Sequence, residues 1–228
     1  YGVGVGPGDP ELLTLRAVKV IKSADVICLP KADKDKCRAY QIALPVVPEL
    51  RYKKVVSYEF EMTKDESRLK EMHRNFYNKY RQLLLDGYNL AFLTIGDPTI
   101  YSTFGYIMKL AKADGIDVEI INGITSFCGT AAASGVMISE GDDTIHIISG
   151  QDDIDEALKY SGTKVIMKSG KNIEQIKAKL IELENQGKIS VYAVIDCGME
   201  TEQIFTSSTT IPDDSRYMMT IIIKDKNN

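Results

Sequence analysis

The sequence has few of the residues that catalytic metal sites and disulfide-rich folds require. In 228 residues there is no tryptophan, and there are two histidines and four cysteines. His73 and His146 lie far apart and no Cys-x-x-Cys pair occurs, so the spacing of a metal site or disulfide framework is missing. We therefore expect no protein-bound catalytic metal, a structural role for His146 in a strand-like run, and a solvated position for His73 on a charged helix.

Long apolar runs and an excess of basic residues are also missing. No apolar stretch reaches the length of a membrane helix, and there is no polybasic tail. A net charge of −4 gives no reason to expect nucleic acid or an anionic membrane as a partner. The first residues follow a strand pattern and no signal-peptide pattern, and the cysteines fit a reducing compartment. We therefore expect a cytoplasmic location.

What is present is the composition of a globular protein, arranged as alternating strands and helices. Hydrophobic residues make up 44% of the chain and charged residues 26%. Strands are predicted at 3–5, 25–29, 55–60, 90–93, 118–121, 144–149, 164–168, 190–196 and 216–224, the last with a hairpin partner near 202–206. Helices are predicted at 12–22, 67–85, 101–111, 127–134, 154–160 and 173–185, with Thr14 as a candidate cap of the first. The pattern predicts an α/β fold of two α/β domains, residues 1–113 and 114–228, with a ligand cleft between them.

The segment from Thr94 to Phe104 joins a predicted buried strand to a predicted helix. Its Gly96-Asp97-Pro98 turn lies where ligands bind in open α/β sheets, outside the carboxyl ends of the strands. Glycine lets the backbone approach a ligand, whereas aspartate suits a helix N-cap and proline suits the first helical position. These residues therefore fit either a ligand site or a well-capped helix without a ligand.

A second glycine-rich turn, Gly6-Pro7-Gly8, follows the first predicted strand. It is not a dinucleotide fingerprint, because Pro7 and Asp9 occupy the positions that a third glycine would need. It is not a P-loop either, because no Gly-Lys-Ser or Gly-Lys-Thr follows. An ordinary turn and a turn whose backbone approaches a ligand both remain open.

Three motifs together resemble those of the tetrapyrrole methylases. They are residues 3–14 (VGVGPGDPELLT), Gly96-Asp97-Pro98 with Tyr101, and residues 122–126 (NGITS). The last is similar to a Pro-Gly-Ile-Ser/Thr-Ser turn in which Asn122 replaces the proline, and we expect this replacement to loosen the turn. The resemblance runs over the whole chain, with the motifs in order and at the expected separations.

The resemblance implies the tetrapyrrole methylase fold and a methyltransferase that uses S-adenosylmethionine, bound between two domains of a subunit that usually forms a homodimer. Residues 94–104 (TIGDPTIYSTF) most resemble the branch that methylates C-20 of precorrin-2 or of cobalt-factor II (cobalt-precorrin-2) in cobalamin (vitamin B12) biosynthesis. The family positions for the methyl donor fall on Pro7, Gly96, Asp97, Ile100, Thr125, Ser126, Met167 and Gly198.

Methyl transfer from a sulfonium to a carbon is an in-line displacement that needs no metal and no protein nucleophile. Its main requirement is near-attack geometry between donor and acceptor, which can lower the barrier by about 7–11 kcal/mol. The acceptor carbon also loses a proton, so Asp97 and Tyr101 are the predicted catalytic residues. For Asp97, the favoured alternative to base catalysis is that it caps its helix and shapes the donor pocket.

The charged segment 31–38 is either a solvated loop or part of a substrate site. A tetrapyrrole acceptor carries several carboxylates, and this loop leaves the carboxyl end of a predicted strand. Lys31 and Arg38 are therefore the predicted substrate-binding residues, with Lys34 and Lys36 beside them.

Other functions remain open from the sequence alone. A sister enzyme would methylate another ring carbon or uroporphyrinogen. A non-catalytic nucleotide-binding module would use the glycine turns to hold a phosphate. A structural or interaction protein would bind no small molecule at all.

Overall fold

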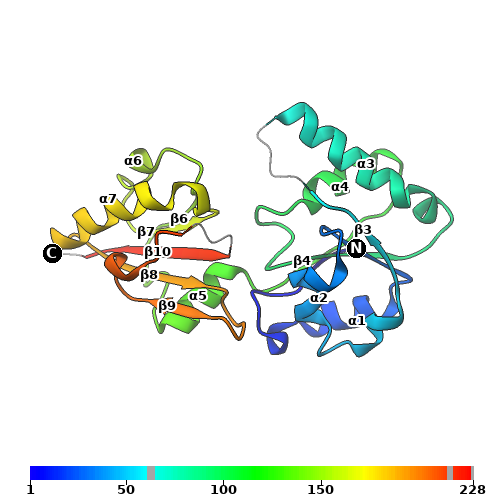
Figure 1. The fold of residues 1–228 in the computed structure, drawn as a ribbon, viewed down its shortest axis with the longest axis horizontal. Helices are drawn as coiled ribbons and strands as arrows, with labels where there is room; N and C mark the ends of the chain where they lie inside the picture. Colours follow the sequence, from blue (N-terminus) through cyan, green and yellow to red (C-terminus); the bar gives the residue numbers. More distant parts are fainter. Residues whose placement is uncertain (61–64, 215–217, 227–228) are drawn as a thin grey trace. The chain divides into compact units, whose positions relative to one another are not determined.

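The computed structural model describes residues 1–60, 65–214 and 218–226. The chain divides into two compact units, Tyr1–Thr125 and Ser126–Asn228, each built on a five-stranded sheet (Figure 1). The sequence places the boundary at 113/114, ahead of β5 (Ile120–Ile121), whereas the structure adds β5 to the first sheet beside β1. The first unit is therefore longer than the pattern of strands and helices predicts.

The first unit is a parallel sheet with helices on both faces. The strand order is β3-β2-β4-β1-β5, and every neighbouring pair is parallel. The strands are β1 (Gly2–Gly4), β2 (Val26–Leu29), β3 (Lys54–Ser57), β4 (Leu90–Thr94) and β5. Helices α1 (Leu15–Ser23) and α2 (Arg38–Ala43) lie on one side, and α3 (Glu66–Leu85) and α4 (Phe104–Ala113) on the other (Figure 1). All carboxyl ends of the strands therefore meet at one edge.

The start of α1 follows directly from the local sequence. Thr14 is the N-cap, as predicted, and its hydroxyl accepts a hydrogen bond from the amide of Ala17. Pro10–Leu12 form a short 3₁₀ turn that is capped by Asp9, so the α-helix begins later than the apolar spacing predicts. The glycine turn and α1 are thus joined by a capped 3₁₀ turn.

The prediction that Asp97 caps the next helix is wrong. Helix α4 begins at Phe104 with Thr103 at the N-cap position. The Asp97 side chain instead accepts from the amide of Thr99, and the Asp97 carbonyl accepts from the amide of Ile100, which closes a turn. Tyr101 then takes a left-handed φ of 48°, a conformation that no α-helix contains. The helix therefore cannot start until this residue has been passed.

The second unit is a mixed sheet. The strand order is β6-β7-β10-β8-β9, with β6 and β7 parallel and the remaining neighbours antiparallel. The strands are β6 (Ile145–Ser149), β7 (Thr163–Met167), β8 (Ile189–Ile195), β9 (Gln203–Phe205) and β10 (Met219–Asp225). Helices α6 (Ile154–Ala157) and α7 (Ile173–Asn185) cover one face, and α5 (Ser126–Ser134) covers the other (Figure 1). The predicted hairpin partner of the last strand pairs with β8 instead, and Arg216, the predicted start of that strand, lies outside the described residues.

The prediction of a solvated His73 is also wrong. Its side chain is 5% exposed and stacks on Tyr106 of α4, with ring centroids 4.2 Å apart. The ring reaches this position because α3 and α4 pack side by side. His146 lies in β6 as predicted, with Nε2 3.0 Å from the carbonyl oxygen of Ser161. Within the described part of the chain, no helix has both the length and the apolar character to cross a membrane.

Candidate functional site: two sheet edges

Three glycine turns meet at the carboxyl edge of the first sheet, where β1, β4 and β5 end. Gly6 and Gly96 form an antiparallel bridge, in which each amide donates to the other's carbonyl at 3.3 and 2.8 Å. A side chain on Gly123 would place its Cβ 2.2 Å from the carbonyl oxygen of Gly96, and one on Gly4 would place it 2.6 Å from the amide of Gly123. The backbones are in such close contact that only glycine fits.

The Asp97 carboxylate joins two of these turns. Its Oδ1 accepts from the Thr99 amide at 2.8 Å and from the Thr99 hydroxyl at 2.5 Å. Its Oδ2 accepts from the Asn122 side-chain amide at 2.9 Å and from the Gly123 amide at 3.1 Å. Asp97 is only 6% exposed, whereas its partners Thr99 and Asn122 are exposed, so the four bonds are partly buried. Asp97 thus holds the turn after β4 against the turn after β5.

The electrostatics of Asp97 agree with a structural role. Burial acts to raise the pKa of its carboxyl, but the hydrogen bonds from Thr99, Asn122 and Gly123 outweigh burial and hold the pKa below its ordinary value. The carboxylate is therefore charged at neutral pH and is a weak base. Both oxygens already accept two hydrogen bonds, which favours the pocket-shaping alternative over proton abstraction.

Asn122 makes hydrogen bonds that counteract the expected loosening of its turn. Its side chain donates to Asp97, and its carbonyl oxygen lies 3.3 Å from the donating hydroxyl of Thr14. The same hydroxyl caps α1. Asn122 therefore connects the segments that follow three different strands, and its hydrogen bonds replace the conformational restraint of a proline ring.

The other predicted residues of this unit lie on the same edge. Pro7 is buried next to the Gly6–Gly96 bridge, and Ile100 is half-buried in the turn that Asp97 closes. Tyr101 is 43% exposed and follows directly. Thr125 ends the turn that begins at Asn122, and its hydroxyl oxygen is buried with no hydrogen-bond partner among the described residues. An unpaired buried hydroxyl is unfavourable by about 1–3 kcal/mol, so this atom favours a ligand that supplies the missing bond.

The predicted residues of the second unit also share one sheet edge. Met167 ends β7 and pairs with Thr220 of β10, whose hydroxyl lies 3.2 Å from the hydroxyl of Ser126 at the start of α5. Gly198 follows the end of β8, and its amide donates to Glu202 at 2.7 Å. Strands β7 and β8 end at this edge and β10 begins there, so the three residues gather although they are far apart in sequence.

Backbone conformation marks Tyr101, which the sequence also selected, and two residues that the sequence did not select, Lys168 and Asp196. Tyr101, Lys168 and Asp196 are the non-glycine residues with a left-handed φ in the described ranges, at 48°, 58° and 52°. Each lies in or next to a predicted site segment, since Lys168 follows Met167 and Asp196 precedes Gly198 by two positions. Such strained backbone is concentrated at functional sites. Aspartate adopts this conformation more readily than most residues, whereas lysine carries no signal for it. The places of Lys168 and Asp196 directly after β7 and β8 could also have pointed to them.

Lys31 and Arg38 lie in the segment after β2, on the same carboxyl edge of the first sheet. Lys31 forms an ion pair with Glu59, which also accepts from the amide of Ala32 at 3.0 Å. The bond from Lys31, the amide of Ala32 and the nearby positive charge hold the pKa of Glu59 below its ordinary value. Arg38 is the first residue of α2. The charge of Lys31 is therefore balanced, and a substrate carboxylate has to compete with Glu59 for it.

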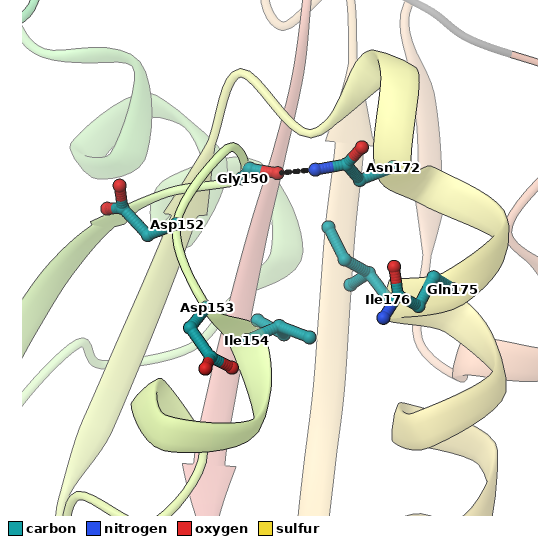
Figure 2. A pocket seen from close by; sticks show the side chains of 7 residues that line it. All are labelled: Gly150, Asp152, Asp153, Ile154, Asn172, Gln175 and Ile176. Atoms are coloured by element: carbon teal, nitrogen blue, oxygen red, sulfur yellow. Dashed lines mark hydrogen bonds between the residues drawn. The ribbon is translucent and has the colours of Figure 1, made fainter.

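A separate pocket of about 220 Å³ lies in the second unit between the segment after β6 and the start of α7 (Figure 2). The side chain of Asn172 donates to the carbonyl of Gly150 at 2.7 Å on its wall, and Asp153 caps α6. None of the predicted site residues lines this pocket. Residues 1–60, 65–214 and 218–226 hold no group of three or more histidine, cysteine, aspartate or glutamate side chains placed to bind a metal.

Comparison with known proteins gives a consistent assignment. The model of the family described as Tetrapyrrole (Corrin/Porphyrin) Methylases matches residues 1–212. A relative from Methanocaldococcus jannaschii, named "Probable cobalt-precorrin-2 C(20)-methyltransferase", is 38% identical over 205 residues, which cover 90% of this chain and 85% of the relative. A Precorrin-2 C(20)-methyltransferase from Sinorhizobium sp. is 28% identical over 97% of this chain and 93% of its own.

Solved structures agree with the fold. A cobalt precorrin-4 methyltransferase superposes with a TM-score of 0.72 at 21% identity, covering 98% of this chain and 93% of its own. A uroporphyrin-III C-methyltransferase from Thermus thermophilus, complexed with S-adenyl homocysteine, gives a TM-score of 0.68 at 21% identity, covering 98% and 96%. The predicted tetrapyrrole methylase fold of two α/β domains is thereby confirmed. This chain belongs to the tetrapyrrole (corrin/porphyrin) methylase family.

Proposed function

We propose that the protein is an S-adenosylmethionine-dependent methyltransferase that methylates C-20 of cobalt-precorrin-2 (cobalt-factor II) or precorrin-2 in cobalamin biosynthesis. The observation that carries the proposal is the 38% identity, over 90% of the chain, to the relative that bears the cobalt-precorrin-2 C(20) name. A Uroporphyrinogen-III C-methyltransferase from Bacillus subtilis is 30% identical over 82% of the chain. Methylation of uroporphyrinogen, or of another ring carbon, is therefore the competing function.

The residues present fit the methyl donor. S-adenosylmethionine supplies an electrophilic methyl group on a sulfonium. The close backbone packing of Gly4 and Gly123 against the Gly96 carbonyl holds the turns of this edge in place, and the buried hydroxyl of Thr125 has no partner among the described residues. The residues that would hold the donor are Pro7, Gly96, Asp97, Ile100 and Thr125 of the first unit, and Ser126, Met167 and Gly198 of the second.

The chain's own groups divide into holding and proton-transfer roles. Asp97 keeps two turns of the donor site together through its four hydrogen bonds. Tyr101 is the proposed acid or base, since its side chain is 43% exposed at the same edge. Lys31 and Arg38 bind carboxylates of the macrocycle, and Lys31 exchanges Glu59 for the substrate.

Calorimetric titration with S-adenosylhomocysteine, with ATP and NAD as controls, tests the donor. We expect micromolar binding of the homocysteine compound, about −8 kcal/mol, and none of the other two. Binding of a nucleotide in its place would favour the non-catalytic nucleotide-binding module. The absence of all binding by folded protein would overturn the methyltransferase proposal.

The position of the new methyl group tests the acceptor. Purified protein is incubated with the donor and with metal-free precorrin-2, its cobalt complex, or uroporphyrinogen, and the product is analysed by mass spectrometry and ¹³C NMR. We expect methylation at C-20, and methylation elsewhere would assign a sister activity. Arg38→Ala is expected to raise the KM for the tetrapyrrole, and an unchanged KM would remove Arg38 from the substrate site.

We further propose a homodimer in the cytoplasm. The dimer is supported by the motif resemblance and is tested by light scattering of the purified protein. The compartment is supported by the thiols, because Cys28, Cys37, Cys128 and Cys197 are all free.

A further inference from the structure

Asn122 is an exposed residue whose side chain is bonded to a buried one. The residue is exposed, yet its side chain is directed at the buried carboxylate of Asp97, with Nδ2 2.9 Å from Oδ2. Its carbonyl oxygen accepts from Thr14. The side-chain amide of an exposed asparagine can be fully hydrated. Asn122 instead forms hydrogen bonds to Asp97 and Thr14, which lie in two segments distant in sequence.

The side chain of Asn122 decides how Asp97 Oδ2 is satisfied. Without it, that oxygen retains the Gly123 amide alone, at 3.1 Å. Gly123 in turn lies in backbone contact with Gly96 and Gly4, where a Cβ atom has no room. A small shift of the Asp97 carboxylate therefore changes the orientation of the Gly123 amide and of the Gly96 carbonyl together.

We infer that Asn122 is a positioning residue for methyl-donor binding, acting through Asp97. By donating to Asp97 Oδ2, it fixes the turns that carry Gly96 and Thr125 in the arrangement that the donor site requires. The inference rests on the proposed function for the assignment of these turns to the donor. It predicts an effect on donor binding that is larger than any effect on the chemical step.

The chain offers a matched control at the opposite edge of the same sheet. Asn89 precedes β4, and Asp25 precedes β2. The side-chain Nδ2 of Asn89 lies 3.5 Å from Oδ2 of Asp25, and the backbone amide of Asn89 donates to the same oxygen at 2.8 Å. Asn89 is exposed like Asn122. Asn89→Ala therefore removes a longer asparagine–aspartate contact, between two exposed residues away from the glycine turns, and keeps the backbone bond.

The experiment compares wild type, Asn122→Ala, Asn122→Asp and Asn89→Ala in calorimetric titration with S-adenosylhomocysteine. Asn122→Ala is expected to raise the Kd about tenfold, because a hydrogen bond to a charged group is lost. Asn122→Asp keeps the shape of the side chain but faces Asp97 with a second carboxylate, so its Kd rises further. Asn89→Ala stays within twofold of wild type, and thermal unfolding shows that all four proteins are folded.

Steady-state methyl transfer to precorrin-2 separates positioning from a merely structural role. Asn122→Ala is expected to raise the KM for S-adenosylmethionine about tenfold while kcat stays within twofold. A fall in kcat at constant KM, or a Kd for S-adenosylhomocysteine within twofold of wild type, would overturn the inference and leave the proposed function standing. If wild type itself fails to bind S-adenosylhomocysteine, the proposed function falls and the inference with it.

Discussion

The two sheet edges that carry the predicted site achieve unusual backbone conformations in opposite ways. The first edge uses glycine, so that Gly4, Gly96 and Gly123 pack backbone against backbone and the Asp97 carboxylate joins the turns. The second edge places ordinary residues, Lys168 and Asp196, in the left-handed region. The first solution costs chain entropy, and the second costs local strain. The difference teaches that residue type reveals one edge and hides the other.

The sharpest break of this comparison is Gly123→Ala. The new Cβ would lie 2.2 Å from the Gly96 carbonyl oxygen, so one turn has to move. We expect the free energy of unfolding to fall by about 1–3 kcal/mol and binding of S-adenosylhomocysteine to be lost. Thermal unfolding and calorimetry measure both.

Gly105→Ala is the control for this variant, because a Cβ at Gly105 in α4 meets no atom within 4 Å. It is expected to stabilise the protein by about 0.5–1 kcal/mol, as alanine does inside a helix. Equal behaviour of the two variants would show that the first edge does not depend on glycine.

Asp97→Asn is expected to have the next largest effect. An amide keeps the size of the carboxylate but turns two of its four acceptor positions into donors that face donors, which costs about 1–3 kcal/mol. Since the folded-state pKa of Asp97 lies below its ordinary value of 3.8, its contribution is fully present above that value and is lost as pH falls below it. Urea unfolding of both proteins between pH 7 and pH 3 measures the difference.

The stability gap between wild type and Asp97→Asn should therefore be constant from pH 7 to about pH 4 and narrow only below it. A gap that already narrows near pH 6 would mean that the carboxyl titrates near neutrality. That result would return Asp97 to the role of a catalytic base.

Lys168→Gly sharpens the comparison from the other side and has the smallest expected effect. Glycine removes the strain of a φ of 58°, worth about 1–2 kcal/mol, but loses more chain entropy, so a net gain below about 1 kcal/mol is expected. Lys168→Ala truncates the same side chain without relieving the backbone and should bring no gain. Differential scanning calorimetry of the pair measures it, and equal melting temperatures would show that the second edge is unstrained.

Local rules predicted those parts of the site whose partners are near in sequence. Most strands, the longer amphipathic helices, the cap at Thr14 and the glycine turns follow from patterns within a few residues, whereas the short helix α2 was not predicted. The helix start at Phe104 did not, because the Asp97 carboxylate bonds Asn122 and Gly123, which lie 25 and 26 residues further along. The burial of His73 was missed for the same reason, since its partner Tyr106 belongs to another helix.

The site of the second unit was accessible only through resemblance. Ser126 and Met167 have no chemistry that marks them, and Thr220, which meets both, comes late in the chain. The positive φ of Lys168 has no counterpart in its side-chain type, and an aspartate such as Asp196 occurs in many other conformations as well. The sequence does not reveal the register between β7 and β10, which places Met167 beside Thr220.

The position of β1 has a consequence for how the protein is made. Its two neighbours are β4 and β5, so Gly2–Gly4 pair with residues 92–94 and 120–121. A nascent chain emerging at 5–20 residues per second carries this strand without its partners for roughly 5–20 s. Among the five strands of the first sheet, β1 is thus the earliest to be synthesised and among the last to pair with its neighbours. Sheet assembly waits for long-range closure, which is the slow kind of folding step.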